Sequence, residues 1–406
     1  MTGTSTPDAH VTRASHGPIG VLMVTGAYFP DLSGAGLQCR ALVQHLRTTI
    51  RVAVVTTTTD PLLAAEDDVD GVPVHRVFVQ PNRTWSKLAA TFLMTRIMLR
   101  ERRRFSILHL HGFSQKSMLV VALGLVMGKR IAIKLTSVGH DDPISMRKHG
   151  RLEYWCYSQA HLYFGVSPRF QSLYEASGLP GGRFRLIPNG VDLDRFQPAS
   201  SDQRRAVRRE LNLPLDAAVV LFVGFFSREK CPDVLYDAWA RVALRGDRTT
   251  VLLFVGATRS TYYEVDQDLA RDIRVRAAQA GLEGRVHFVE TTQEIDKYYR
   301  AADVFVLPSV REGLPNALLE AMACGTACVA TRLESVTDTL IDDGSSGVLV
   351  PPRDAEGIAT ALELLLSHPE QARAMGARAR ERVERDFALT DVVQSYLDVY
   401  QELAST

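Results

Sequence analysis

Two glutamates, Glu312 and Glu320, mark the stretch of the chain best suited to chemistry. The run Val304 to Leu307 before them is apolar and rich in β-branched residues, and Pro308 ends it, which predicts a buried strand. Good helix formers follow from Asn316, and Gly325 supplies a stop. The stretch therefore predicts a strand, a loop that carries Glu312, and a helix that carries Glu320.

This unit has the properties of a sugar-nucleotide site. Free backbone N–H groups and the positive end of the helix dipole favour a diphosphate at the loop. Carboxylates beside it can accept hydrogen bonds from sugar or ribose hydroxyls. The spacing alone is weak evidence, because a chain with 46 acidic residues contains several such pairs by chance.

The context of the two glutamates is more specific. Together with the Ala-Met-Ala-Cys-Gly that follows Glu320, the stretch resembles the signature of the retaining GT-B glycosyltransferases of family 4. The resemblance implies that Glu312 lies beside the donor sugar and that Glu320 holds the nucleotide ribose. It also implies donor contacts for the intervening residues Gly313, Leu314 and Asn316.

Alternating strands and helices continue along the chain. At 406 residues the chain is too long for one ordinary core, so two domains are expected. The predicted fold class is α/β, and the resemblance implies the GT-B architecture, two facing doubly wound (Rossmann-like) domains with an interdomain cleft. We expect a disordered tail at 1–18, an acceptor-side domain at 19–198, a nucleotide-sugar domain at 199–384, and a helix at 385–406 that crosses back.

The first predicted strand, 19–25, leads into a turn with Gly34 and Gly36 before a helix at 37–46. The turn is too short for a GxGxxG fingerprint and no acidic residue ends the next strand, which argues against a dehydrogenase. In the family this loop faces the acceptor and the donor phosphates, and the two glycines allow close backbone approach.

Two histidines follow predicted strands of the first domain. A histidine at a strand's carboxyl end can point into the cleft and bind a sugar hydroxyl or a phosphate. The resemblance indicates His140 as the donor-facing histidine and His111 as a cleft-lining residue. Each could instead cap a strand or a backbone carbonyl.

A basic residue, Lys230, lies between a predicted strand and helix of the second domain, where a cation suits phosphate. The family has a Gly-Arg…Lys set here, and this chain offers Gly224 and Lys230 but Phe225 in place of the arginine. Arg228 is a candidate substitute, and a surface lysine is the alternative for Lys230. The resemblance also implies a backbone contact from the Thr292 loop to the nucleotide base, whereas Glu334-Ser335 replaces the family's Gly-Gly.

No metal and no cofactor are expected, with a nucleotide-diphosphate sugar as co-substrate. His109 and His111 share a face of a strand, but no third ligand is near them in the sequence. The five cysteines form no CxxC pair and their number is odd, which argues against a disulfide framework.

Charge is divided unevenly between the two halves. Residues 1–198 carry 23 Lys and Arg against 14 Asp and Glu, although the whole chain has a net charge of +1. This split indicates an anionic surface partner such as lipid. The predicted helix from Trp85 to Arg104 has Trp85, Leu88, Phe92 and Leu99 on one side. We favour packing of that side on the sheet over contact with a membrane.

The function expected from these features is retaining transfer of a sugar from a nucleotide diphosphate to an acceptor hydroxyl, in glycan, polysaccharide or glycoconjugate biosynthesis. The acceptor is a sugar, a lipid-linked compound or a small molecule. The expected location is the cytoplasm, with peripheral contact at the inner membrane face and no nucleic-acid partner. Two alternatives remain open: a nucleotide-sugar 2-epimerase of the same fold, and a degenerate protein that binds a nucleotide sugar without turnover.

Overall fold

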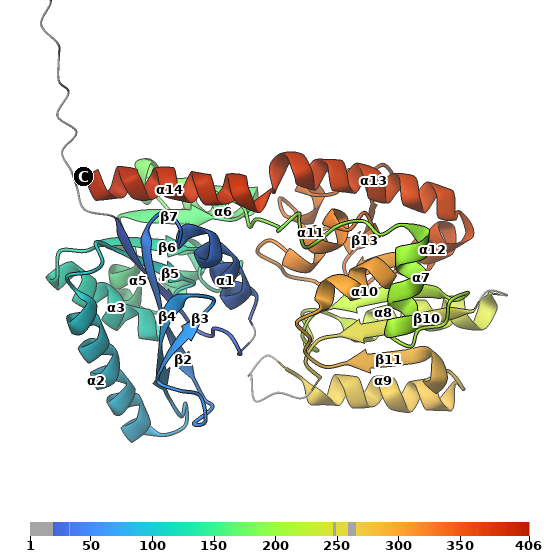
Figure 1. The fold of residues 1–406 in the computed structure, drawn as a ribbon, viewed down its shortest axis with the longest axis horizontal. Helices are drawn as coiled ribbons and strands as arrows, with labels where there is room; N and C mark the ends of the chain where they lie inside the picture. The colour runs from blue at the N-terminus through green and yellow to red at the C-terminus, as the bar shows by residue number, and fades with distance from the viewer. Residues whose placement is uncertain (1–18, 32, 247–248, 259–264, 406) are drawn as a thin grey trace, which may run out of the picture.

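The computed structural model describes residues 19–405 except 32, 247–248 and 259–264. The tail expected at 1–18 lies outside this part of the chain. Within the described ranges the strands form two sheets, of eight and six strands, which belong to two domains set side by side (Figure 1). The two doubly wound domains predicted from the sequence are therefore confirmed.

The first sheet has the order β3-β4-β2-β1-β5-β6-β7-β8. Its strands pair in parallel, apart from the antiparallel hairpin of β3 with β4. Helices α1, α2, α3, α6 and α14 (Leu389–Ser405) pack against it, while α4 packs on α5 and α6, and α5 packs on α3. The elements are β1 (Gly20–Thr25), α1 (Gly34–Leu46), β2 (Arg51–Thr58), β3 (Glu66–Val69), β4 (Val72–Phe78), α2 (Thr84–Glu101), β5 (Ile107–His111), α3 (Gln115–Val126), β6 (Arg130–Lys134), α4 (Pro143–His149), α5 (Arg151–Ser158), β7 (Leu162–Gly165), α6 (Pro168–Glu175) and β8 (Phe184–Leu186).

The second sheet is parallel throughout, in the order β11-β10-β9-β12-β13-β14. Its strand order reverses between β9 and β12, and in the first sheet it reverses between β1 and β5. Ligands of doubly wound sheets bind beyond the carboxyl ends of the strands at such reversals. The elements are α7 (Ser201–Glu210), β9 (Ala218–Val223), α8 (Pro232–Arg245), β10 (Thr250–Val255), α9 (Gln267–Gln279), β11 (Val286–Val289), α10 (Ile295–Ala301), β12 (Val304–Leu307), α11 (Asn316–Ala323), β13 (Ala327–Thr331), β14 (Val348–Val350), α12 (Ala355–Ser367), α13 (Pro369–Asp386) and α14 (Leu389–Ser405).

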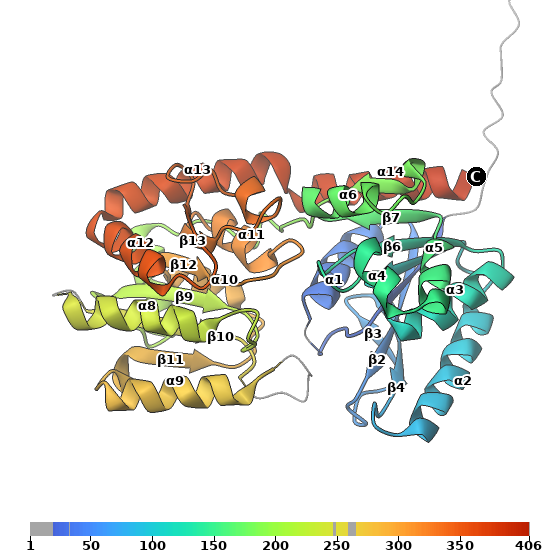
Figure 2. The ribbon, with the colours of Figure 1, turned by 180° about the vertical axis from the view of Figure 1, so that it is seen from behind.

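The chain passes between the domains twice. The first passage follows β8, and the second joins α13, which packs on α11 and β13, to α14, which packs on α1 and β5. The two passages lie side by side, because Val191 N donates to Phe387 O at 2.9 Å and Leu389 N donates to Val191 O at 3.0 Å. Figure 2 shows α13 and α14 extending along the same side of both domains.

Helix α2 packs on the sheet through a different side from the one predicted. Met94, Ile97 and Met98 are buried. Trp85 and Phe92, on the side that we expected to pack, are 84% and 72% exposed. The expectation was wrong because both sides of this helix carry large apolar residues, and the sequence pattern does not distinguish them.

Candidate active site

The loop between β12 and α11 carries Glu312, and it meets the loop between β9 and α8. The Glu312 side chain is 8% exposed. The Lys230 ammonium donates to both of its carboxylate oxygens, at 2.6 and 2.8 Å. β9 and β12 are the strands at which the order of the second sheet reverses. The topology therefore joins two predicted site residues that are 82 positions apart in the sequence.

A second ion pair fixes the same two loops. Arg311 lies 2.5 Å from the Glu229 carboxylate, and Val310 N donates to Glu229 O at 2.8 Å. Charge-assisted hydrogen bonds of this kind hold planar groups in a fixed orientation. The sequence analysis did not single out Arg311 or Glu229, because each is an ordinary charged loop residue until the loops are placed together.

Glu320 lies one helical turn inside α11 and is half-buried. Its carboxylate accepts a hydrogen bond from the Tyr299 hydroxyl at 2.8 Å. Burial raises the pKa of Glu320 to about 7, although the Tyr299 hydrogen bond and the Arg195 charge act in the opposite direction. The carboxyl therefore changes charge near neutral pH, which is unusual for glutamate.

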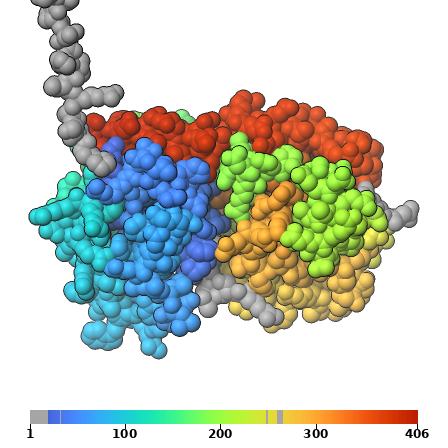
Figure 3. Space-filling view, in the orientation of Figure 1, coloured from blue at the N-terminus to red at the C-terminus, as the bar shows by residue number. Residues whose placement is uncertain are grey.

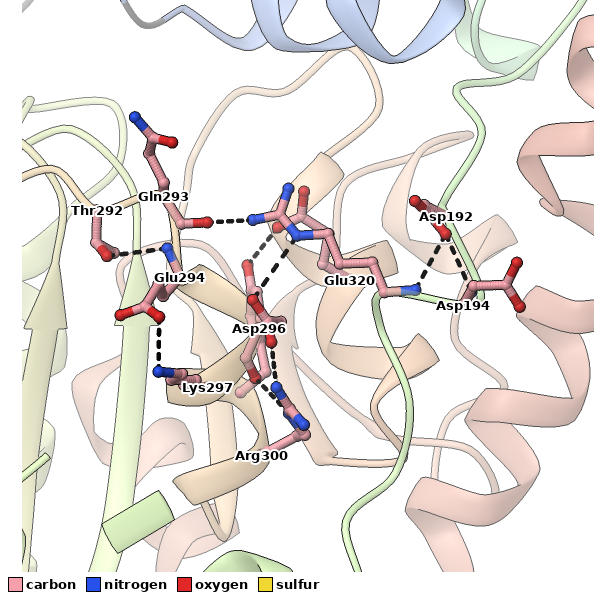
Figure 4. A network of polar contacts seen from close by, with 11 residues as sticks. Asp192, Asp194, Thr292, Gln293, Glu294, Asp296, Lys297, Arg300 and Glu320 are labelled. Carbon is pink, nitrogen blue, oxygen red and sulfur yellow. Dashed lines mark hydrogen bonds and ion pairs between the residues drawn. The ribbon is translucent and has the colours of Figure 1, made fainter. Parts of the chain in front are cut away.

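Polar residues from the first interdomain passage and from the loop before α10 surround Glu320 (Figure 4). The Arg195 side chain donates to Gln293 O at 2.5 Å and lies 3.7 Å from Asp296. Thr292 accepts a hydrogen bond from Glu294 N at 3.1 Å in the loop that leads into α10. The loop predicted to contact the base thus adjoins the ribose candidate, and Arg195 and Tyr299 are contributors that the sequence analysis missed.

Asn316 connects the second domain to the first. Its amide donates to Gly34 O at 3.3 Å, and its side-chain oxygen accepts from Asn189 at 2.8 Å. The buried Leu314 adds a weaker contact, through its carbonyl, to Asn189 at 3.5 Å. The structure therefore brings three predicted residues, Gly34, Leu314 and Asn316, to one point between the domains.

Two predicted glycines are required by close packing. A Cβ at Gly313 would lie 2.2 Å from Thr136 O of the first domain, and a Cβ at Gly36 would lie 2.4 Å from Ala27 O. We expected Gly34 and Gly36 in a turn before α1, but they form the first turn of that helix. The Ser33 side chain caps it by accepting a hydrogen bond from Gly36 N at 3.0 Å. In the second domain, Gly224 N donates to Val255 O at 3.0 Å at the end of β9.

The two predicted histidines lie in different surroundings. His140 is exposed in the turn after β6, next to Gly139, whose added Cβ would lie 3.4 Å from the Arg311 guanidinium. His111 is only 5% exposed, and neither ring nitrogen has a partner within the described residues. Burial, and then the charges of His109 and Lys134, hold the pKa of His111 well below 6.5. His111 therefore lies beneath the surface as a neutral ring, and its expected role as a cleft-lining residue stays a prediction.

The turn that carries His140 is held by two buried aspartates. Asp141 accepts from Thr136 N at 2.8 Å and from Ser137 N at 2.9 Å, and burial raises its pKa to about 6. Asp142 accepts from Gly139 N at 2.7 Å and caps α4. These contacts fix the first-domain surface that faces Arg311 and Gly313.

Arg228 does not join the Lys230 and Glu312 pair. Its side chain is 76% exposed and lies 3.0 Å from Asp266. Glu334 and Ser335, the replacements for the family's glycines, contact the first domain: Arg169 N donates to Ser335 O at 3.1 Å, and the Arg169 side chain lies 3.8 Å from Glu334. These departures from the family pattern therefore add contacts between the domains.

Figure 3 shows the two domains in contact beneath the red helices α13 and α14.

Across the part of the chain that the structure describes, no group of three or more His, Cys, Asp or Glu side chains is arranged to hold a metal ion. In the same residues, no helix combines the length and the apolar character needed to span a membrane.

Comparison with known families agrees with this geometry. Residues 203–382 match the family described as glycosyl transferases group 1, and residues 32–195 match glycosyltransferase family 4. The two matches cover most of both domains. The chain therefore belongs to the GT-B glycosyltransferases that these two families describe.

Curated relatives are similar over part of the chain. The D-inositol 3-phosphate glycosyltransferase of Saccharomonospora viridis is 36% identical over 223 residues, which are 54% of this chain and 50% of that protein. The same name is carried by a protein of Salinispora tropica, 38% identical over 54% of this chain and 46% of its own length. This chain thus spans about half the length of the curated relatives it matches.

Solved structures are similar over nearly the whole chain. Sucrose-phosphate synthase from Thermosynechococcus elongatus has a TM-score of 0.79 at 24% identity, over 95% of this chain and 99% of that one. HepE from Anabaena, solved with UDP and glucose, has a TM-score of 0.76 at 18% identity, over 94% and 99%. At these identities the likeness establishes the fold.

Proposed function

We propose that this chain is a retaining glycosyltransferase that moves a sugar from a nucleotide diphosphate to an acceptor hydroxyl without a metal ion. The ion pair of Lys230 with Glu312, at the reversal of the second sheet, is the observation that carries the proposal. A cation and a carboxylate at this reversal support the proposal, because ligands of doubly wound sheets bind there and these two groups suit a diphosphate and a sugar hydroxyl.

Each group has a physical task in this proposal. The bond between the sugar and the diphosphate breaks, and negative charge builds up on the leaving oxygen. The Lys230 ammonium, the N–H groups at the start of α11 and the helix dipole stabilise that charge, because they are fixed before the reaction begins. Glu312 accepts hydrogen bonds from the donor sugar, while Glu320 accepts them from the ribose.

We further propose that the acceptor attacks from the face that the diphosphate leaves, so that the anomeric configuration is retained. The acceptor side is formed by the first domain, near Gly34 and the turn that carries His140. The relatives named D-inositol 3-phosphate glycosyltransferase support the inclusion of a phosphorylated cyclitol among the acceptors tested. HepE, solved with UDP-glucose, supports UDP-glucose as the first donor to test.

A nucleotide-release assay tests the proposal. Purified protein is incubated with UDP-, GDP- and ADP-sugars, with and without acceptors, and the free nucleoside diphosphate is measured. We expect release from one donor, reduced at least about a hundredfold by Glu312→Gln, because the substitution removes the charge that orients Lys230 and the sugar. Glu363→Gln, an exposed change on α12, is the matched control and should leave release unchanged.

The outcomes separate this proposal from its alternatives. Full release by Glu312→Gln would contradict the role given to Glu312. Binding of a nucleotide sugar by calorimetry, with no release under any acceptor condition, would favour the degenerate binder. Conversion of the donor to its 2-epimer would favour the epimerase, and inversion at the anomeric carbon of the product would contradict retention.

A further inference from the structure

Helix α2 presents a second apolar side to solvent. Trp85, Leu88, Phe92 and Leu99 are 84%, 56%, 72% and 43% exposed. Their spacing places them on one side of a helix, within about one third of its circumference. Met94, Ile97 and Met98 occupy the opposite side and are buried. We call this exposed set the outer stripe of α2.

Large apolar side chains gathered in one place on a protein surface mark an interaction site, and the outer stripe is such a group. Figures 1 and 2 both place α2 at the outer edge of the first domain, on the side away from the second domain. Closure of the domains on each other therefore does not cover the stripe. The occupant must come from outside the described chain.

Positive charge flanks the outer stripe. Arg96, on the same side of the helix, and Arg103, just beyond its end, are exposed, and among the described residues no acidic side chain lies within ion-pair distance of them. Glu101, the acidic residue of α2, is buried and engaged by Arg100 and Arg104 at 3.1 and 3.2 Å. The helix surface that surrounds the stripe is therefore basic.

A hollow of about 130 Å³ opens beside the stripe, between α2 and the β3–β4 hairpin. Arg76, Arg96 and Arg100 line it together with Leu93 and Glu66. Asp67 pairs with Arg76 at 2.7 Å, and Glu66 pairs with Arg100 at 2.5 Å. Arg96, the third arginine of the hollow, has no such ion pair. It therefore gives the hollow an excess of positive charge next to the apolar side chains.

We propose that the outer stripe of α2 docks on an anionic lipid bilayer. Trp85, Leu88, Phe92 and Leu99 enter the boundary between headgroups and acyl chains, while Arg96 and Arg103 meet lipid phosphates. This deepens the proposed function by holding a transferase at the surface where lipid-linked acceptors reside. Docking itself does not require turnover, so the two proposals fail independently.

Charge distinguishes a bilayer from a second copy of the chain. A symmetric dimer through α2 would bring the same stripe, and therefore the same basic residues, face to face. Like charges in such a contact repel, whereas anionic lipid headgroups attract them. The basic flanks thus favour a lipid surface as the occupant.

Co-sedimentation with vesicles tests the proposal. The full chain is mixed with vesicles of phosphatidylcholine alone or of an equimolar mixture with phosphatidylglycerol. We expect binding to the anionic vesicles to fall as salt rises. The triple variant Trp85→Ser/Leu88→Ser/Phe92→Ser should bind at least about tenfold more weakly, because it loses the inserted apolar area. The matched control is Leu244→Ser/Val275→Ser, which removes two exposed apolar side chains from the second domain.

A charge reversal and a fluorescence measurement complete the test. Arg96→Glu should weaken binding, whereas Arg205→Glu on the exposed side of α7 should not. In a Trp155→Phe background, Trp85 emission should shift to shorter wavelength on anionic vesicles, because the buried Trp239 is already shielded from water. Circular dichroism of each variant verifies its fold.

Three outcomes would overturn the proposal. The first is equal sedimentation of the triple variant and the parent protein. The second is equal recovery with neutral and anionic vesicles. The third is a lipid-free dimer, seen by sedimentation velocity, that the triple variant converts to monomer, which would assign the stripe to a second copy.

Discussion

At the scale of residues, the candidate site combines an ion pair with a carboxyl group, Glu320, whose pKa is raised. The Lys230 ammonium donates two hydrogen bonds to the Glu312 carboxylate. Each side chain therefore stays in this position unless a ligand offers a competing partner. Glu320 differs, because burial raises its pKa to about 7 and a neutral tyrosine hydroxyl is its hydrogen-bond partner. A ligand that donates hydrogen bonds to Glu320 would stabilise the ionised form.

The raised pKa predicts a pH dependence of nucleotide binding. As pH rises through about 7, Glu320 loses its proton, and the carboxylate accepts hydroxyl donors more strongly than the acid does. Affinity for the nucleoside diphosphate of the donor should therefore increase between about pH 6 and pH 8, by up to about tenfold, with proton release on binding. Isothermal titration calorimetry in buffers of different ionisation enthalpy measures both effects.

Glu320→Gln is the control for this prediction. Its amide does not titrate, so the pH dependence should shrink to the part that comes from the phosphates of the ligand. An equal rise in affinity for the variant and the parent protein would show that Glu320 is not the titrating group.

At the scale of elements, α14 belongs to the core of the first domain. Tyr396 and Tyr400 are fully buried against His109 and Phe164. The Tyr400 hydroxyl lies 2.6 Å from His109 Nδ1, and burial holds the pKa of His109 well below 6.5. A single hydrogen bond thus joins the neutral ring on β5 to the last helix.

Removal of that hydrogen bond should destabilise the protein. Tyr400→Phe leaves a buried ring nitrogen of His109 without its partner, which costs about 1–3 kcal/mol of the free energy of unfolding. Urea denaturation followed by circular dichroism measures the change. Tyr298→Phe, a half-buried tyrosine of α10, is the control and should change the free energy by less than about 0.5 kcal/mol. Equal stability of both variants would contradict a structural role for this bond.

The elements also show what the sequence could predict. The strand Val304–Leu307 and the helix after it were predicted because an apolar run and a glycine stop are local signals. The β3–β4 hairpin was missed, although Asp70 and Gly71 both have positive φ, at 56° and 76°, and Asp-Gly is a strong hairpin signal. Its strand β3 consists of three acidic residues and a valine, so it has no apolar run by which a strand could be predicted.

Contacts between distant residues could not be predicted in the same way. The spacing in the sequence does not indicate that Lys230 reaches Glu312, or that Arg169 reaches Ser335, because both contacts depend on how loops and domains meet. The burial of His111 likewise depends on α1 and α14, which cover its face of the sheet. Both sides of α2 carry large apolar residues, so the sequence pattern does not indicate which side packs on the sheet.

At the scale of the whole molecule, several contacts between the domains involve backbone groups. Gly313 approaches Thr136 O, Asn316 reaches Gly34 O, and Arg169 N reaches Ser335 O. The site residues lie on these meeting loops, so the separation of the domains sets the geometry of the site. A small change in that separation should affect the reaction more than the stability of either core.

Gly313→Ala tests the dependence on domain separation. The added methyl would lie 2.2 Å from Thr136 O, so the loop must retreat from the first domain. We expect nucleotide release to fall at least about tenfold, since displacements of about 1 Å at a reacting centre cost that much or more. The radius of gyration from small-angle X-ray scattering should increase slightly, with unchanged thermal unfolding.

Gly284→Ala is the matched control, because a Cβ at that position meets no atom within 4 Å. It should leave both release and the radius of gyration unchanged. Full activity of Gly313→Ala would show that the close approach of the two loops is not needed for the reaction.

The double passage of the chain gives the molecule an unusual order of parts. Because α14 completes the domain that β1 begins, the second domain is an insertion within the first, entered after β8 and left before α14. The two connections lie side by side at Val191 and Ala388, so the insert has neighbouring ends. Such a segment can be excised and closed with a short linker, or moved as a cassette into a related chain. If the two domains bind donor and acceptor as we propose, donor specificity could then be exchanged while the first domain remains intact.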